Sequence, residues 1–217
     1  MQKASGKIIK VSGPLVVASG MESAKIYEVV QVSDQRLIGE VIGLKGDVAS
    51  IQVYEETSGL GPGGPVYQTG HSLSVELGPG LLSSIYDGIQ RPLDLIYEQV
   101  GHFITRGVQV PALDREKKWD FKAVVKTGDT LSGGDIVGEV KETELITHKI
   151  MVPPNVSGVV EEVNSGKYTI EEVVAKVGGV DIKMKQVWSI RTPRPIKKKL
   201  LPKEPLITGQ RVIDTFF

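Results

Sequence analysis

Residues 74–93 read SVELGPGLLSSIYDGIQRPL, and the fold of the chain is decided around them. The Gly-Pro-Gly at 78–80 ends a run that reads as a strand, because glycine permits positive φ and proline offers no amide hydrogen to a ladder. After it the apolar period changes: Leu81, Ile85 and Ile89 recur every four residues, as on one face of a helix. The segment therefore predicts the end of a β-domain followed by a short helical connector.

A second connector helix is predicted directly after this segment. It begins near Pro92, where the missing amide hydrogen costs nothing, and Gly101 is placed to cap its end. The connector then runs to residue 112, where a charged and aromatic stretch begins.

The composition allows two small domains in 217 residues. Lys+Arg and Asp+Glu both number 26, so net charge gives no argument for a nucleic-acid or membrane partner. The absence of cysteine excludes a disulfide framework and a thiolate metal site. With no long apolar run, the chain is expected to be soluble and cytoplasmic.

Residues 1–77 read as a small all-β domain. In the run 48–54, Ala49, Ile51 and Val53 alternate with polar residues, which predicts one buried and one solvated face. The glycine-rich stretch 59–65 lacks the Gly-Lys-Ser/Thr ending of a phosphate loop, so we interpret it as a turn. The expected strands are 7–11, 15–18, 26–32, 37–44 and 48–54.

The region 113–190 contains a loose half-repeat. VKTGDTLSGGDIVGEV at 125–140 is echoed by VNSGKYTIEEVVAKV at 163–177, an arrangement similar to the flattened barrel of biotinyl and lipoyl carrier domains. A carrier needs a lysine at the tip of a tight hairpin, here expected near 143–145, whereas Lys149 lies further along the descending strand. A carrier or scaffold without catalysis is the alternative function. His148 has no partner spaced for metal or triad chemistry.

Several stretches resemble one family, the catalytic A subunits of V-type and A-type rotary ATPases. The resemblance covers essentially all 217 positions. It implies that 113–121 opens an insertion that distinguishes A subunits from B subunits, and that the last stretch is the strand and helix entering a nucleotide-binding domain. The stretches are GKIIKVSGP (6–14), IQVYEETSG (51–59), GPG (61–63), ELGPG (76–80), YDGIQRPL (86–93), LDREKKWDF (113–121) and PLITGQRVIDTFF (205–217).

The resemblance implies a mainly β fold in four parts. These are an N-terminal six-stranded β-barrel at 1–77, a connector at 78–112 belonging to the nucleotide-binding domain, an insertion domain at 113–190 that resembles a barrel-sandwich, and a linker with the start of the α/β nucleotide-binding domain at 191–217. The phosphate-binding loop of the family is expected beyond residue 217.

The same resemblance implies function. The full-length parent would hydrolyse or synthesise ATP with Mg-ATP bound, coupled to proton or sodium transport, while this portion would hold no catalytic, cofactor-binding or metal-binding residue. The implied partners are B subunits in a ring, a peripheral stalk through the insertion, and a membrane sector reached through other subunits on its cytoplasmic face. No nucleic acid is expected, because the basic stretch 191–199 has no stacking aromatics.

The charged stretch that opens the insertion supplies the candidate interface residues. Aromatic side chains anchor interfaces and charged ones orient them. The candidates are Asp114, Arg115, Lys117, Trp119 and Phe121.

Overall fold

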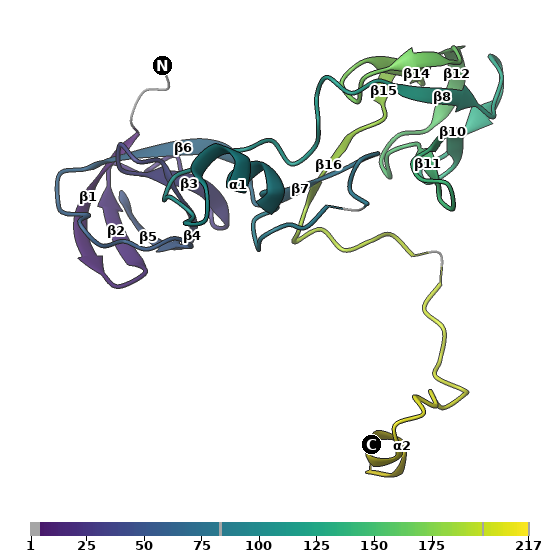
Figure 1. The fold of residues 1–217 in the computed structure, drawn as a ribbon. Helices are drawn as coiled ribbons and strands as arrows, with labels where there is room; N and C mark the ends of the chain where they lie inside the picture. Colours follow the sequence, from purple (N-terminus) through teal and green to yellow (C-terminus); the bar gives the residue numbers. More distant parts are fainter. Residues whose placement is uncertain (1–4, 83, 197, 217) are drawn as a thin grey trace.

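The computed structural model describes residues 5–82, 84–196 and 198–216, and it shows two β-domains joined by a two-stranded ribbon (Figure 1). Residues 1–4 of the predicted first domain, residue 83 of the predicted connector, and residues 197 and 217 of the predicted linker lie outside the described residues.

The first domain is a closed antiparallel barrel in the order β1-β2-β5-β4-β3-β6. Ala49, Ile51 and Val53 are buried, which confirms the predicted inward face of β5. The six-stranded barrel implied by the resemblance is likewise confirmed. Its strands are β1 (Gly6–Ser12), β2 (Leu15–Ser19), β3 (Glu28–Val32), β4 (Leu37–Lys45), β5 (Val48–Val53) and β6 (Pro65–Ser72).

The second domain is a sandwich of two four-stranded sheets, β11-β10-β8-β13 and β15-β14-β12-β9. Phe121 lies fully buried in a core that both sheets share. The two halves of the domain give the barrel-sandwich form that the half-repeat predicted. The strands are β8 (Trp119–Ala123), β9 (Thr130–Leu131), β10 (Ile136–Lys141), β11 (Thr147–Met151), β12 (Gly158–Val163), β13 (Gly166–Tyr168), β14 (Val173–Val177) and β15 (Val180–Lys183).

A ribbon of β7 (Ser74–Leu77) and β16 (Gln186–Ser189) connects the two domains. The strands are antiparallel, with Ser189 opposite Ser74 and Gln186 opposite Leu77. The chain therefore enters and leaves the sandwich side by side.

The helix predicted from Leu81, Ile85 and Ile89 is wrong. The described residues from 78 to 92 form turns and one isolated bridge. The Asp87 carboxylate accepts the Ile89 and Arg91 amides at 3.1 and 2.8 Å, so its side chain competes with helical hydrogen bonds.

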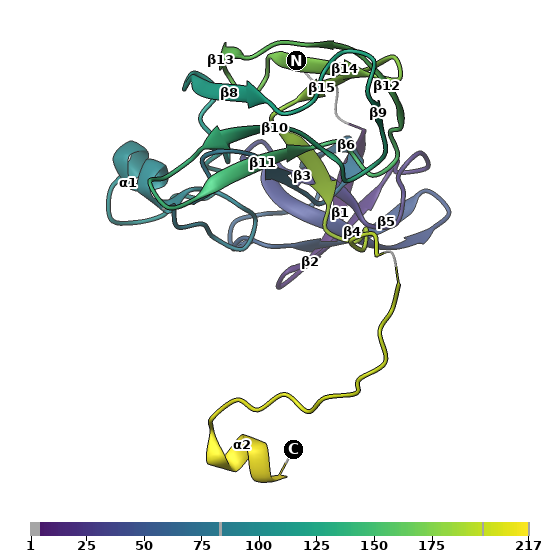
Figure 2. The ribbon, with the colours of Figure 1, turned by 90° about the vertical axis from the view of Figure 1, so that its right-hand side faces the viewer.

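The second connector helix is confirmed. The helix α1 (Leu93–Val100) follows Pro92 and ends at Gly101, whose amide donates to Tyr97 O at 2.8 Å. Figure 2 shows this helix at the left edge of the view, apart from β3.

The C-terminal segment runs away from both domains to α2 (Arg211–Phe216), as Figure 2 shows. The strand expected before this helix is not formed among the described residues 198–210. Neither described helix is long and apolar enough to cross a membrane.

Candidate functional site

The structure places the two aromatic interface candidates inside the sandwich. Trp119 is 6% exposed and Phe121 is fully buried, with the Phe121 ring edge-on to Tyr168. Lys117 Nζ lies 4.0 Å from the centroid of the Trp119 ring. Both aromatic rings are therefore core groups in this structure, and a lysine covers the one nearer the surface.

Of the three charged candidates, Asp114 and Lys117 are exposed at the surface, whereas Arg115 is half-buried. Asp114 accepts the amides of Glu116 and Lys117 at 2.8 and 3.0 Å, and these hydrogen bonds lower the pKa of its carboxyl group. Arg115 instead donates from Nη2 to both carboxylate oxygens of Glu76 in β7, each at 2.6 Å. Arg115 thus joins the ribbon to the entry of the sandwich.

Arg115 belongs to a cluster of ion pairs at the foot of the sandwich. Lys185 Nζ lies 3.3 Å from Glu76 and 2.5 Å from Glu171, and Lys183 lies 3.5 Å from Glu171. The Lys185 hydrogen bond, with the charges of Lys185, Arg115 and Lys183, lowers the pKa of Glu171 despite partial burial. The cluster ties together residues from the ribbon, the entry to the sandwich and the β14–β15 side of the sandwich.

A second set of contacts ties the ribbon to the barrel. Arg191, two residues after β16, donates to the buried Glu40 from Nε at 3.1 Å and Nη2 at 2.6 Å. Its guanidinium lies 3.8 Å from the centroid of the Tyr27 ring. Tyr54 donates its hydroxyl to Glu40, and burial together with that carboxylate raises the Tyr54 pKa.

The connector docks on the barrel through Arg91 and Gly107. Arg91 pairs with Asp87 at 2.7 Å and with Glu55 at 3.5 Å. Burial alone would raise the Asp87 pKa, but hydrogen bonds from Arg91 and Ile89 outweigh it and the pKa is lowered. The Gly107 amide donates to Glu55 at 2.9 Å, and a Cβ on Gly107 would lie 2.0 Å from Gln35 O.

The β10–β11 hairpin is clamped to the connector by Glu142. One carboxylate oxygen accepts the Gly80 and Leu82 amides at 2.6 and 3.2 Å, and the other lies 3.0 Å from His148 Nδ1. The Glu142 side chain is 3% exposed. His148, which lacked a partner on sequence spacing, is therefore one side of a positioning contact.

The hairpin also bears on the carrier alternative. Its tip carries Leu145, which is 95% exposed, and no lysine lies between β10 and β11. Lys149 lies within β11, where it faces Glu139 across the ladder. A carrier function is therefore not favoured.

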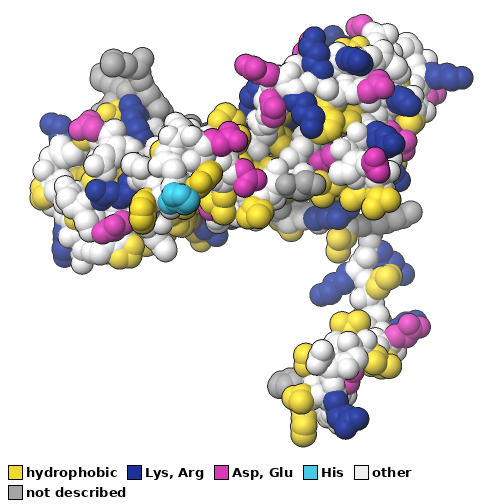
Figure 3. All heavy atoms as spheres, in the orientation of Figure 1, with side chains coloured by type: hydrophobic (Ala, Val, Ile, Leu, Met, Phe, Trp, Pro, Cys, Tyr) yellow, Lys and Arg dark blue, Asp and Glu magenta, His cyan; other side chains and the backbone are white. Residues whose placement is uncertain are grey.

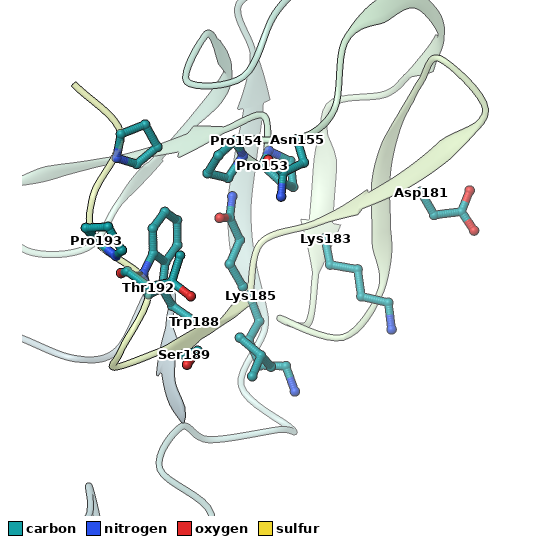
Figure 4. Close-up of a pocket in the computed structure, with 13 residues that line it drawn as sticks. Pro153, Pro154, Asn155, Asp181, Lys183, Lys185, Trp188, Ser189, Thr192 and Pro193 are labelled. Carbon is teal, nitrogen blue, oxygen red and sulfur yellow. Dashed lines mark hydrogen bonds between the residues drawn. The ribbon is translucent and has the colours of Figure 1, made fainter. Parts of the chain in front are cut away.

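A groove of about 670 Å³ lies between the sandwich, β16 and the start of the C-terminal segment (Figure 4). Pro153 and Pro154 come from the loop after β11, and Trp188 points toward the same space from the ribbon. The Trp188 Nε1 donates to Thr192 O at 2.9 Å, so its polar atom is occupied within the chain.

These contacts fix the barrel, the connector, the ribbon and the sandwich relative to one another. Among residues 5–82, 84–196 and 198–216, no three His, Asp or Glu side chains gather as metal ligands. Sequence reasoning missed Glu40, Glu76 and Glu142, because their partners Arg191, Arg115, Lys185 and Gly80 lie far from them in the chain, although His148 is only six residues from Glu142. The one local signal was the basic excess between residues 183 and 203, of which Lys183, Lys185 and Arg191 do pair with glutamates.

Comparisons with known proteins agree with both domains. A family model described as the ATP synthase alpha/beta family beta-barrel domain matches residues 8–70. A second, described as the ATP synthase alpha/beta subunit barrel-sandwich domain, matches residues 110–191. The two matched segments coincide with the two folded cores.

Similar proteins extend the match over nearly the whole chain. The A subunit of the A-type ATP synthase of Pyrococcus abyssi is 64% identical over 99% of this chain and 22% of its own length. The V-type ATP synthase alpha chain of Thermoanaerobacter sp. is 58% identical over 98% of this chain and 37% of its own length. This chain thus spans between 22% and 37% of the length of these curated relatives.

One solved structure, of the assembled ATPase EscN from the enteropathogenic E. coli type III secretion system, is 29% identical and covers 40% of this chain and 21% of its own. Its TM-score of 0.38 carries no argument. The family assignment rests on the two domain matches and on the high identity across 98–99% of the chain. The chain therefore belongs to the ATP synthase alpha/beta family, and over nearly its whole length it is similar to the N-terminal part of the A subunits of A-type and V-type ATP synthases.

Proposed function

We propose that this chain serves assembly in the catalytic A subunit of a rotary ATPase, with the barrel contributing to a ring with B subunits and the sandwich docking a peripheral stalk. The observation that carries the proposal is the coincidence of each folded core with a domain of that family. ATP hydrolysis or synthesis, coupled to proton or sodium transport, belongs to the full-length protein in this proposal.

The outer face of the barrel supports the ring contact. Ile9 in β1 and Ile42 in β4 both lie at register shifts of the ladder, and they are 47% and 45% exposed. Leu15 in β2 and Leu44 in β4 are each 37% exposed. Bulges on a closed barrel thus present apolar side chains outward, as a protein contact requires.

The C-terminal segment supports the link to a nucleotide-binding domain. Its apolar side chains stand away from both described cores, and Figure 3 shows them along the segment and on α2. Val212 and Phe216 are 67% and 78% exposed, although a helix with such residues normally packs them. We assign residues 78–112 and 191–217 to the framework of that further domain, and 113–190 to the insertion.

The sandwich is suited to stalk docking because it has its own core and adjacent ends. Arg115 at its entry and Lys185 at its exit both contact the same Glu76 carboxylate. A unit inserted in this way leaves its outer surface free for a partner. Asp114 and Lys117 stay our candidates for the rim of that contact. The complex would hold the protein peripherally on the cytoplasmic face of the membrane.

The test deletes the sandwich from the full-length protein while keeping the ribbon. Residues 116–184 are replaced by a short flexible linker between Arg115 and Lys185, because both side chains already meet at Glu76. We expect the ring of A and B subunits to form and hydrolyse ATP while stalk proteins no longer co-purify. Loss of turnover in a correctly assembled ring would contradict the proposal.

A companion variant tests the rim without removing the domain. Asp114→Ala with Lys117→Ala removes two exposed charged groups at the entry to the sandwich, and of these Lys117 lies over the Trp119 ring. We expect weaker stalk retention with ATP hydrolysis unchanged. The control is Lys176→Ala, since among the described residues Lys176 forms an ion pair with Glu161 alone, on the β12–β14 sheet.

A further inference from the structure

Among the described residues from 5 to 192, polar side-chain contacts link the barrel, the connector, the ribbon and the sandwich wherever two of them meet. We call these contacts braces. Arg191 binds Glu40 between ribbon and barrel, and Arg115 binds Glu76 between sandwich and ribbon, each pair closing to 2.6 Å. Glu142 holds the β10–β11 hairpin to the connector amides. Every junction thus has a polar contact besides its covalent connections.

The braces combine side chains that have little access to water with more exposed partners, since Arg115 and Arg191 are 31% and 44% exposed. The side chains of Glu142, Glu40 and Lys185 are 3%, 4% and 13% exposed. Breaking one partner of such a pair leaves a poorly solvated charge, which is strongly unfavourable. Salt also screens buried pairs less than exposed ones. These contacts therefore favour a single arrangement of the domains.

The bracing stops at Thr192. The Thr192 amide donates to Ser189 O at 3.0 Å, and its carbonyl accepts from Trp188 Nε1. From 193 to 207 the described residues make no hydrogen bond or ion pair, and the next bonds are local ones around Asp214. Figure 2 shows this stretch leaving the two domains.

We infer that barrel, ribbon, sandwich and the connector at 78–112 form one rigid arm, and that the C-terminal segment leaves this arm at a joint directly after Thr192. The arm is a property of this chain alone. Its mechanical role rests on the proposed function: with a ring contact at the barrel and a stalk contact at the sandwich, the arm holds the two contacts at a fixed separation and orientation.

The inference can be tested on the chain itself by pulsed dipolar electron paramagnetic resonance. The sequence has no cysteine, so two introduced cysteines carry the only spin labels. One pair, Lys45→Cys and Lys167→Cys, spans barrel and sandwich at exposed positions. A second pair, Lys45→Cys and Arg211→Cys, spans barrel and α2. We expect one narrow distance peak for the first pair and a broad distribution for the second.

Matched variants then test the braces. Arg115→Gln with Lys185→Gln removes both cations from Glu76, and we expect the barrel-to-sandwich peak to broaden and shift. The control Lys176→Gln, which removes the exposed pair with Glu161, should leave the peak unchanged. Circular dichroism verifies that each variant keeps its β structure, and Lys185→Gln alone replaces the double variant if it does not.

Any of three results would contradict the inference of a rigid arm. The first is a broad barrel-to-sandwich distance distribution when no brace residue is substituted. The others are a narrow peak in the folded Arg115→Gln, Lys185→Gln variant and a narrow peak for the barrel-to-α2 pair. If the sandwich did not dock a stalk, all three distance measurements would be unchanged. A wrong proposed function can therefore be told apart from a wrong inference of rigidity.

Discussion

Gly138 in β10 is a residue where one added methyl group decides the packing of the sandwich. An ideal Cβ there would lie 2.3 Å from two ring atoms of Phe121, which is fully buried. We predict that Gly138→Ala destabilises the domain by about 1–3 kcal/mol through overpacking. Urea unfolding measures the change. Gly61→Ala is the control, because Gly61 has open space around it, and equal stability of the two variants would contradict the prediction.

Glu171 gives a pH dependence with a defined sign. Its pKa is lowered from 4.5 in the folded chain, chiefly by the Lys185 hydrogen bond. The unfolded chain therefore takes up the proton first as the pH falls. The stabilisation is fully present above the ordinary pKa and is lost as the pH falls through the lower folded value.

We predict that Lys185→Gln raises the Glu171 pKa toward its ordinary value, measured by NMR titration of the carboxyl carbon. Lys176→Gln should leave that titration unchanged, because Lys176 pairs with Glu161 instead. An unchanged Glu171 titration in Lys185→Gln would show that the other cations suffice.

For individual side chains, sequence reasoning identified residue types better than roles. An aromatic pair beside a strand is consistent with either core or interface, and only the fold shows Trp119 and Phe121 to be buried. Arg115 read as a surface charge until the structure placed it on Glu76, 39 residues away in the sequence. Contacts between distant residues leave no local pattern to detect.

Among the elements, the connector depends on the close approach of Gly107 to the barrel. Gly107 has φ +72°, and a Cβ there would meet Gln35 O at 2.0 Å. We predict that Gly107→Ala releases the connector loop, so amides between 87 and 108 exchange faster with solvent while the barrel strands stay protected. Gly88→Ala, which meets open space, is the control. Unchanged exchange in Gly107→Ala would contradict the docking.

Strands were predictable and connector turns were not. Alternation along β5 reports a buried face directly, because successive side chains of a strand point to opposite sides. Leu81, Ile85 and Ile89 matched a helical period equally well, yet the Asp87 carboxylate captures two amides and Gln90 adopts φ +62°. Periodicity does not register such local side-chain competition.

For the chain in its entirety, the prediction concerns nucleotides. The 217 residues contain no Gly-x-x-x-x-Gly-Lys-Ser/Thr stretch, which supplies the backbone cradle, the lysine and the magnesium hydroxyl of a phosphate loop. We predict that this chain alone neither binds nor hydrolyses ATP. Calorimetric titration with Mg-ATP measures binding, and saturable heat in the micromolar range would refute the prediction.

The pairing of β7 with β16 also orders the steps by which the chain acquires its structure. Glu76 and Lys185 meet across 109 residues, so closing that loop in an unstructured chain is entropically costly. The sandwich between them contains mostly nearby pairings and brings its own ends together as it forms. Folding rates follow such locality. We therefore expect β7 and β16 to pair last during biosynthesis, after the sandwich between them has folded.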